Sequence, residues 1–502
     1  MGVRVSFRRT PESMGPGPGS SPGQALRWDD IAGPALRLVD TLARSGRVLA
    51  VVASLAIAAC ATHAPSTGPT HAATAARPAA APAAFSRDLL DAKDREEAFE
   101  YAWHLVDDRF YDPSFNGVDW EAARLRYLPQ LERVQSDGAF YALLAKMVGE
   151  LRDSHTRIYT PREYRNRMES VMSTVGLRVA EVEGEIAVTQ VFPDTSAALA
   201  GIRPGMLVES INGEPARERL HRLEAGAPGD ASPERRQRTI YARMLSNPSN
   251  SSNAPLVLEL REQAVDSAFG NRRYELARTD HEMPLVVSRH VLEGNVGLIS
   301  FNRFRPDAAS DFGRALSRLA DTDGVIVDLR GNPGGNIGAM LSIAQSFFPE
   351  TRLVLTRRTR SLAMPDDDSW RPKIPSEVRI NGSSSAYTHP IAILIDGYSA
   401  SASELLATVL REQRGAYIVG RPSCGCVVGV RSAGYKLAGG GALYVAETGF
   451  VTPQGNRMEG AGIHPDREVA LTLADLRAGV DRDLAVAREW IVRQSSRHAE
   501  EH

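Results

Sequence analysis

The sequence is poor in lysine, in cysteine and in surplus charge of either sign. Its positive charge rests on arginine, because the only lysines are Lys93, Lys146, Lys373 and Lys436. The formal net charge is -2, so no basic surplus indicates a nucleic-acid partner and no acidic bias indicates a charged tail. Three cysteines are too few for a disulfide framework.

The remaining composition is that of an ordinary globular protein. Hydrophobic residues make up 43% and charged residues 24%, which excludes a mostly disordered or fibrous chain. A chain of 502 residues is too long for one compact domain and predicts about three.

The first 60 residues read as a lipoprotein signal region. Residues 48–59 form an apolar run of about a dozen residues, shorter than the 20 or so of a membrane span but typical of a signal peptide. The run ends at Cys60, and residues 57–60 resemble a bacterial lipobox, whose cysteine is lipidated and becomes the mature N-terminus. A lone buried cysteine in a helix is the alternative. The long lead before Arg44 indicates that the true start lies nearer to that residue.

The lipobox resemblance sets an expectation for location. Residues 61–85 are rich in alanine and proline and predict a solvated tether. No aspartate follows Cys60, which in bacterial sorting leaves a lipid anchor in the outer membrane. We therefore expect the folded part to work on the periplasmic side, held by lipid and not by a spanning helix.

Four folded segments follow the tether. Residues 86–172 predict a helical domain, since apolar residues recur at helical spacing. In residues 266–480, apolar runs at 296–301, 324–329 and 391–395 alternate with helical patterns, which predicts a partly parallel sheet. Residues 481–502 predict a C-terminal helix or tail.

Residues 173–265 resemble a PDZ domain. Two β-branched runs flank the turn Glu183-Gly184, and residues 197–213 give a short helix, a Gly-x-x-x-Gly turn and a strand ending in Ile-Asn-Gly. By this resemblance Val175, Gly176 and Leu177 hold a peptide's terminal carboxylate, and the peptide adds as a strand. A small β-barrel without a ligand is the alternative. The Ser/Asn/Pro-rich stretch 227–253 predicts a loop or insertion.

The chemistry gathers in a few segments. Residues 396–404 crowd small residues at a strand-to-helix turn, where unpaired amides and the helix dipole favour negative charge. A nucleophile whose attack creates an oxyanion suits such a turn, although a cluster of N-cap serines would have the same sequence. Residues 328–335 predict a strand that ends in a glycine-rich loop.

Four motifs in this order carry a family resemblance: Asp-Ser-His-Thr at 153–156, Asp-Leu-Arg-x-Asn-Pro-Gly-Gly at 328–335, Ser-Ala-Ser-Ala-Ser-Glu at 399–404 and Gly-Ile-x-Pro-Asp at 462–466. With a PDZ-like segment inserted ahead of the last three, residues 86 to about 480 resemble the C-terminal processing (tail-specific) serine proteases and the related tricorn core proteases. The resemblance implies an α/β, ClpP/crotonase-like protease core with an N-terminal helical domain, and no cofactor or metal. It also implies Ser401 as nucleophile, with an oxyanion hole from Ala402 and either Gly334 or Gly335.

One departure from the family is prominent. Processing proteases activate their serine with a lysine after the glycine at position 425, and here that residue is Cys426. The glutamine expected four residues later is Val430, and no other lysine matches the position. A serine without a base is a poor nucleophile.

Two hypotheses answer this departure. By resemblance to the tricorn branch, His155 is the base, and Ser154 and Glu459 orient it; its ordinary pKa of about 6.5 suits the role, and His464 is a competing candidate. The other hypothesis is an inactive protease that binds peptides or protein C-termini, or a scaffold that uses the PDZ module alone. The relay hypothesis predicts polypeptide substrates, with an adaptor or a homo-oligomer left open.

The cysteines Cys424 and Cys426 leave three alternatives. They could be small buried residues, Cys426 could itself be a nucleophile, or the two could pair in an oxidising periplasm. An extended strand would hold their Cα atoms too far apart, so pairing requires a bend at Gly425.

Overall fold

The computed structural model describes residues 90–227, 231–246, 254–263, 269–282, 285–360 and 376–500. The predicted signal region 1–60 with Cys60 and the tether 61–85 lie outside the described residues. Among the helices that the structure describes, none is long and apolar enough to cross a membrane.

The N-terminal segment is built on three helices, α2 Ala92–Arg109, α3 Trp120–Tyr127 and α4 Asp137–Gly149. The residues before these helices are Asp91, Asp119 and Ser136 respectively. The side chain of each accepts a hydrogen bond from a backbone N–H of the first turn, which satisfies one of the amides left unpaired at a helix start. A fourth helix, α5 Pro161–Met168, follows, and the 3-10 turns of this segment are Phe115–Gly117 and Leu128–Arg133.

The prediction that residues 86–172 are helical is incomplete. Strand β1, Arg157–Tyr159, pairs with β19, Ala442–Tyr444, and strand β2, Val171–Thr174, pairs with β9, Thr279–Glu282. Strands this short are too brief to show a period-2 pattern, and each pairs with a strand more than 100 residues away, so only the tertiary structure specifies them.

A second sheet follows in the order β3-β4-β5-β7-β8, with β6 paired to β5. The predicted boundary at residue 265 falls inside this sheet, because β7 and β8 form one hairpin that closes it. Its strands are β3 Leu177–Val182, β4 Glu185–Val191, β5 Leu207–Ile211, β6 Glu214–Pro215, β7 Leu256–Gln263 and β8 Phe269–Leu276, and its helices are α6 Ser196–Leu199 and α7 Ala216–Ala225.

Residues 227–253, predicted as a loop or insertion, are not a loop throughout, because they contain the helix α8, Pro233–Met244. The Ser232 side chain accepts the Arg235 N–H at 3.0 Å, and proline occupies the first helical position. Both features are helix-start signals. The Ser/Asn/Pro-rich residues on either side of the helix nevertheless favoured the prediction of a loop or insertion.

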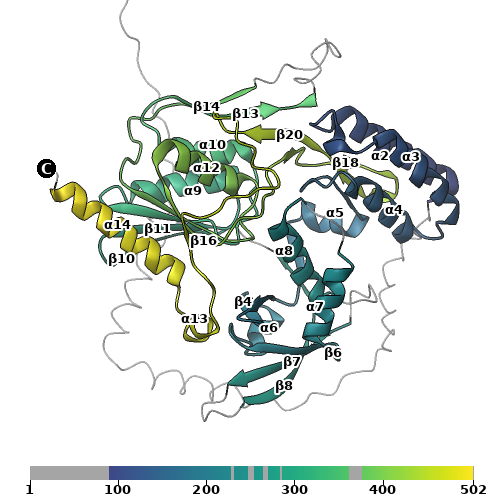
Figure 1. Cartoon of the computed structure of the whole chain (residues 1–502), viewed down its shortest axis with the longest axis horizontal. Helices are drawn as coiled ribbons and strands as arrows, with labels where there is room; N and C mark the ends of the chain where they lie inside the picture. The colour runs from purple at the N-terminus through teal and green to yellow at the C-terminus, as the bar shows by residue number, and fades with distance from the viewer. Residues whose placement is uncertain are drawn as a thin grey trace, which may run out of the picture. The chain divides into compact units, whose positions relative to one another are not determined.

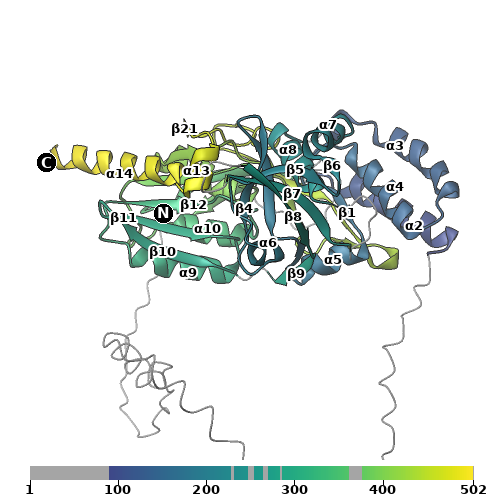
Figure 2. The same ribbon diagram turned by 90° about the horizontal axis from the view of Figure 1, so that it is seen from below.

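The core is a six-stranded sheet in the order β10-β11-β12-β15-β16-β21, parallel except for β10. Helices α9, α10 and α12 cover one face and α14 the other (Figure 1, Figure 2). Val325 and Val327 belong to the hydrophobic core on the first face, and Ile326 belongs to the core on the second face. A strand that is covered on both faces needs such a continuous apolar run. The bounds are β10 Val287–Leu292, β11 Val296–Phe301, β12 Gly324–Asp328, β15 Ile391–Ile395, β16 Tyr417–Gly420, β21 Arg467–Glu468, α9 Pro306–Ser317, α10 Ile337–Gln345, α12 Ala402–Arg414, α13 Leu473–Ala478 and α14 Arg482–Glu500.

Two smaller sheets complete this part of the chain. One has the order β14-β13-β20-β17 and the other β1-β19-β18, so the second joins the N-terminal segment to the C-terminal part. The remaining bounds are β13 Arg352–Arg358, β14 Glu377–Ile380, β17 Gly429–Val430, β18 Tyr435–Lys436, β20 Ala446–Val451 and the 3-10 turn Ala438–Gly440.

Candidate active site

The nucleophile candidate lies on a sharp turn between β15 and α12. Ser401 has φ 57° and ψ −115°, a left-handed conformation that is strained for a residue with a Cβ. The neighbouring serines are buried, with the Ser399 hydroxyl donating to Leu329 O at 2.8 Å and that of Ser403 to Asn332 O at 2.9 Å. Ser401 alone of the three is partly exposed, so the structure singles it out.

The glycine-rich loop lies beside this turn because β12 and β15 are parallel neighbours. The Ala400 N–H donates to Asn332 O at 3.1 Å, which joins the two loops. The Gly334 N–H donates to Asn332 Oδ1 at 2.9 Å, whereas no hydrogen bond of the described residues uses the Gly335 N–H. The Gly335 amide and that of Ala402, the first residue of α12, are therefore the candidate oxyanion donors.

The base candidate lies on the turn after α4. Asp153 Oδ1 accepts the His155 N–H at 2.7 Å and the Thr156 N–H at 2.6 Å, which shapes the turn. Ser154 Oγ lies 2.5 Å from His155 Nδ1 and donates to Glu459 Oε2 at 3.1 Å, and the Ser154 N–H donates to Glu459 Oε1 at 2.8 Å. The structure thus brings the predicted residues Ser154, His155 and Glu459 together.

Two carboxylates hold the segment 423–428 between the nucleophile and the base. Glu404 Oε2 accepts the N–H groups of Ser401 at 3.0 Å and Cys426 at 2.9 Å, while Oε1 accepts the Gly425 N–H at 2.7 Å. Glu459 Oε2 accepts the Val427 N–H at 2.6 Å. Burial raises the pKa of Glu404 to about 7 and also raises the pKa of Glu459, although these donors favour the charged forms. Glu404 was not among the predicted site residues, although it belongs to the quoted motif.

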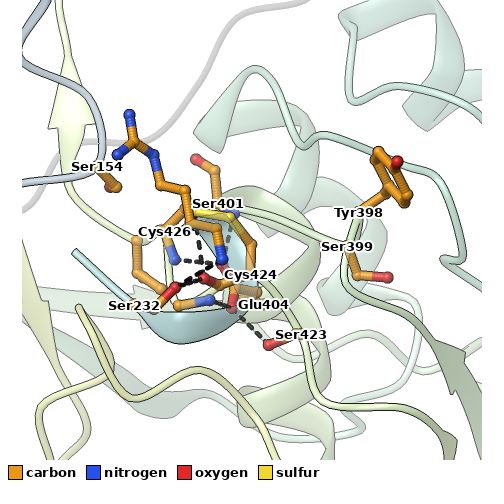
Figure 3. The surroundings of a disulfide bond; sticks show 12 residues. Ser154, Ser232, Tyr398, Ser399, Ser401, Glu404, Ser423, Cys424 and Cys426 are labelled. Atoms are coloured by element: carbon orange, nitrogen blue, oxygen red, sulfur yellow. Dashed lines mark hydrogen bonds between the residues drawn. A yellow bond between two sulfur atoms is a disulfide. The ribbon is translucent and has the colours of Figure 1, made fainter. Parts of the chain in front are cut away.

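Cys424 and Cys426 form a disulfide beside Ser401 (Figure 3). Their Cα atoms are 5.2 Å apart, and Gly425 between them has φ +69°, so the chain bends where the pairing requires it. Both cysteines are buried and pack on Ala400, the residue before the nucleophile. A disulfide sulfur is no thiolate, so the alternative of Cys426 as nucleophile does not fit this structure.

Arginines that were not among the predicted site residues surround the histidine. Burial, followed by the charges of Arg157, Arg235, Arg167 and Arg238, lowers the pKa of His155 to about 3. Arg235 and Arg238 belong to α8, so overlooking that helix hid them. The Ser-Pro start of α8 was the one sequence signal that could have found them.

The predicted peptide site lies at the edge of the second sheet, on a strand that contacts the loop before Ser401. Val175 and Gly176 precede β3 and Leu177 opens it, and β3 is an edge strand of its sheet. The Gly176 N–H donates to Thr174 Oγ1 at 2.9 Å. From β3, the Arg178 guanidinium lies 3.7 Å from the ring centroid of Tyr398, which links this strand to the loop before Ser401.

Some predicted partners are not in contact. Among the described residues no hydrogen bond joins Ser401 to His155. His464, the competing base, is exposed, as are the lysines that the structure describes, Lys93, Lys146 and Lys436. Hydrogen bonds of catalytic groups are often long before a substrate binds, so this geometry leaves the His155 hypothesis in place.

Comparisons with known proteins bear on this arrangement. Residues 295–469 match the family model of peptidase family S41, and residues 91–149 match the tricorn protease C1 domain. The chain is 28% identical to carboxyl-terminal-processing peptidase 3, chloroplastic, of Arabidopsis thaliana over 392 residues, which covers 74% of this chain and 69% of the relative. It is 26% identical to the carboxyl-terminal-processing protease of a Synechocystis strain over 375 residues, which covers 73% of this chain and 79% of that protein.

A solved structure shares the fold. The crystal structure of mature CPAF matches with a TM-score of 0.57 and 13% sequence identity, covering 80% of this chain and 96% of that chain. Its complex with lactacystin gives the same TM-score and covers 82% and 98%. This likeness shows a mixed α/β fold, and the sequence matches to peptidase family S41 and to carboxyl-terminal-processing proteases identify the chain as a serine-type peptidase.

Proposed function

We propose that the protein is a serine endopeptidase that cleaves polypeptides with a Ser401–His155 pair in place of a serine–lysine dyad. The observation that carries the proposal is the hydrogen-bonded chain from His155 through Ser154 to Glu459. The Ser154 hydroxyl donates its hydrogen bond to the Glu459 carboxylate. The hydroxyl oxygen is therefore free to accept a hydrogen bond from His155 Nδ1–H. This arrangement fixes the tautomer in which Nε2 carries the lone pair that a base needs.

The reaction then follows in two stages. Ser401 Oγ attacks the scissile carbonyl carbon while its proton passes to His155 Nε2, and the amides of Ala402 and Gly335 stabilise the oxyanion. His155 next gives the proton to the leaving amine, the C–N bond breaks, and an ester to Ser401 remains. Water, deprotonated by His155, hydrolyses that ester and restores both residues. Closure of the Ser401–His155 contact accompanies substrate binding.

The substrates of the proposal are extended or C-terminal segments of polypeptides. The relatives' names describe carboxyl-terminal processing, and the PDZ-like strand β3 lies at a sheet edge next to the nucleophile loop. We propose that a peptide adds to this edge at Val175, Gly176 and Leu177 and so reaches Ser401.

The location belongs to the proposal as well. The apolar run and Cys60 support a lipoprotein anchored in the outer membrane, with the site on the periplasmic side. Expression of the full chain and of Cys60→Ser in a Gram-negative host, followed by fractionation and mass analysis of the N-terminal peptide, tests it. A diacylglyceryl Cys60 in the membrane fraction, lost in the variant, is expected; unmodified Cys60 in a soluble protein contradicts the anchor.

The catalytic proposal is tested with a fluorophosphonate probe and intact-mass measurement. One adduct is expected in wild type and in His464→Gln, a control that removes the exposed histidine. Ser401→Ala should give no adduct, and His155→Gln should react about 10²-fold to 10⁴-fold more slowly, the usual contribution of a general base.

The opposite outcomes are distinct. Labelling of His155→Gln at the wild-type rate would exclude His155 as the base, while Ser401 would remain the nucleophile. A folded wild type that takes up no probe between neutral and alkaline pH would instead favour the peptide-binding protein without turnover.

A further inference from the structure

A cavity of about 730 Å³ lies between α4, the turn 153–156, β1 and α8. From α4 it receives the small residues Ala142, Ala145 and Gly149 together with Lys146 and Val148. From α8 it receives Arg235, Thr239 and Arg243, which are four residues apart and share one helix face. The cavity therefore lies between α4 and an arginine-bearing face of α8, with room for a few amino-acid residues.

Basic side chains dominate its lining. Two acidic residues line it, Glu150 and Asp153. Glu150 is paired with Arg126, which lies outside the lining. Asp153 Oδ1 accepts two amides of the turn, while Asp153 Oδ2 is buried without a hydrogen-bond partner among the described residues. The basic residues that line the cavity are Lys146, Arg152, Arg157, Arg235, Arg236 and Arg243.

These positive charges crowd one another. Burial, then the charges of Arg157 and Arg238, lowers the pKa of Arg235 to about 10, while the charges of Asp153 and Glu459 act in the opposite direction; the usual value is above 12. Burial and the charge of Arg157 likewise lower the pKa of Arg238. A carboxylate that entered the cavity would offset this repulsion and would form charge-assisted hydrogen bonds to guanidinium groups.

The cavity adjoins the turn that bears His155. Asp153, Thr156 and Arg157 line it, and His155 lies between them in the same turn. In the proposed reaction His155 protonates the leaving amine, so the segment that follows the scissile bond departs past His155. In the proposed reaction, that segment enters the cavity next to this turn.

We propose that this cavity binds the part of a polypeptide substrate that follows the scissile bond and selects segments with aspartate or glutamate side chains. This inference rests on the proposed function, since the direction of the peptide follows from His155 acting on the leaving amine. Recognition is by side-chain carboxylates, because the basic groups are spread from Lys146 on α4 to Arg243 at the far end of α8 and not focused on one point.

The experiment uses internally quenched peptides with amidated C-termini and the full chain. Two peptides are identical up to the scissile bond and carry after it either Asp and Glu or the isosteric Asn and Gln. We expect kcat/KM to be at least tenfold higher for the acidic peptide, and this preference to weaken at high salt because charge pairs at a half-open cavity are screened.

The variants separate the cavity from general charge. Arg243→Gln changes an exposed residue at the end of α8, and Arg289→Gln on β10 removes an equally exposed arginine outside the cavity lining. Arg243→Gln should reduce the ratio of kcat/KM for the acidic peptide to that for the neutral peptide at least threefold, and Arg289→Gln should keep this ratio.

The failures of the two proposals are distinguishable. Equal cleavage of both peptides by wild type would overturn the cavity proposal and leave the peptidase in place. If wild type cleaves neither peptide, binding of the acidic and the neutral leaving segments to Ser401→Ala, measured by fluorescence anisotropy, decides. Preference for the acidic segment that Arg243→Gln removes supports the cavity proposal, and equal or absent binding overturns it.

Discussion

The two halves of the active site are built in opposite ways. The nucleophile half consists of two loops that follow adjacent parallel strands of one sheet, and buried side chains hold these loops by hydrogen bonds to the backbone. The base half joins Ser154 to Glu459 across 305 positions of sequence, and charged residues from three segments surround it. Rigid sheet topology thus positions the group that attacks, while the contacts between segments position the group that moves protons.

This difference predicts where each half is vulnerable. Changes in the nucleophile half should act through backbone geometry, because Ser401, Gly334 and Gly335 all have positive φ. Changes in the base half should act through charge and hydrogen bonding, because its groups are carboxylates, a hydroxyl, an imidazole and guanidinium groups. Four experiments separate the two modes.

The largest effect is expected from Gly335→Ala. An added Cβ would lie 2.3 Å from Phe304 O, and φ is +144°, so the loop and its amide must move away from the oxyanion position. Loss of one oxyanion donor lowers kcat by about 10²-fold to 10³-fold. Gly455→Ala is the control, because it has φ +87° but no atom within 4 Å of the added Cβ. Steady-state kinetics should show a large loss in the first variant only; equal losses in both would mean that φ strain alone is responsible.

The second experiment compares the two carboxylates. Glu459→Gln leaves the shape of the site but removes the charge that stabilises the Ser154–His155 chain, so kcat should fall about 10-fold to 10²-fold, less than for a carboxylate that contacts the histidine directly. Glu404→Gln places an amide NH₂ among buried donors, so the free energy of unfolding should fall by about 1–3 kcal/mol.

Chemical denaturation and kinetics of both variants give the contrast. A Glu459→Gln variant with full kcat would exclude Glu459 from the relay. A Glu404→Gln variant as stable as wild type would show that the buried donors tolerate a neutral partner.

Much of the nucleophile half could be predicted from the sequence, and much of the base half could not. Ser401 and the glycine pair follow apolar strand runs, so a motif and the parallel order of β12 and β15 suffice to bring them together. Ser154, His155 and Glu459 were assigned by resemblance alone, since no local pattern joins positions 305 residues apart. Which glycine keeps a free amide depends on the Asn332 side chain, and only the three-dimensional structure shows it.

The third experiment concerns pH. The pKa of His155 is lowered to about 3 in the folded protein, while an unfolded histidine titrates near 6.5. Between these values the unfolded chain binds more protons, so the contribution of His155 to stability is full above pH 6.5 and is lost as the pH falls toward 3, by up to about 1.4 kcal/mol per pH unit.

Urea denaturation of wild type and of His155→Gln at several pH values from 7.5 to 4.5 gives the free energy of unfolding of each protein. The difference between the two values, followed over pH, isolates the contribution of His155. The difference in the free energy of unfolding should shift against wild type as the pH falls, and His464→Gln, which removes an exposed histidine, is measured alongside as the control. A flat difference for His155→Gln would mean that burial and the arginine charges do not suppress protonation of the imidazole.

The smallest effect is expected from removing the disulfide, because the segment that bears it is already held by both carboxylates. In the double variant Cys424→Ser/Cys426→Ser, the hydrogen bonds from the backbone of residues 425–428 to Glu404 and Glu459 remain. The bond closes a loop of very few residues, so its loss should lower the free energy of unfolding by about 1–2 kcal/mol. Probe labelling of Ser401 should then stay within about threefold of wild type, since neither sulfur takes part in proton transfer and a threefold change in rate is well under 1 kcal/mol. A loss of labelling as large as that of His155→Gln would contradict this prediction. It would mean that the bend at Gly425, held by the disulfide, helps to position Ser401.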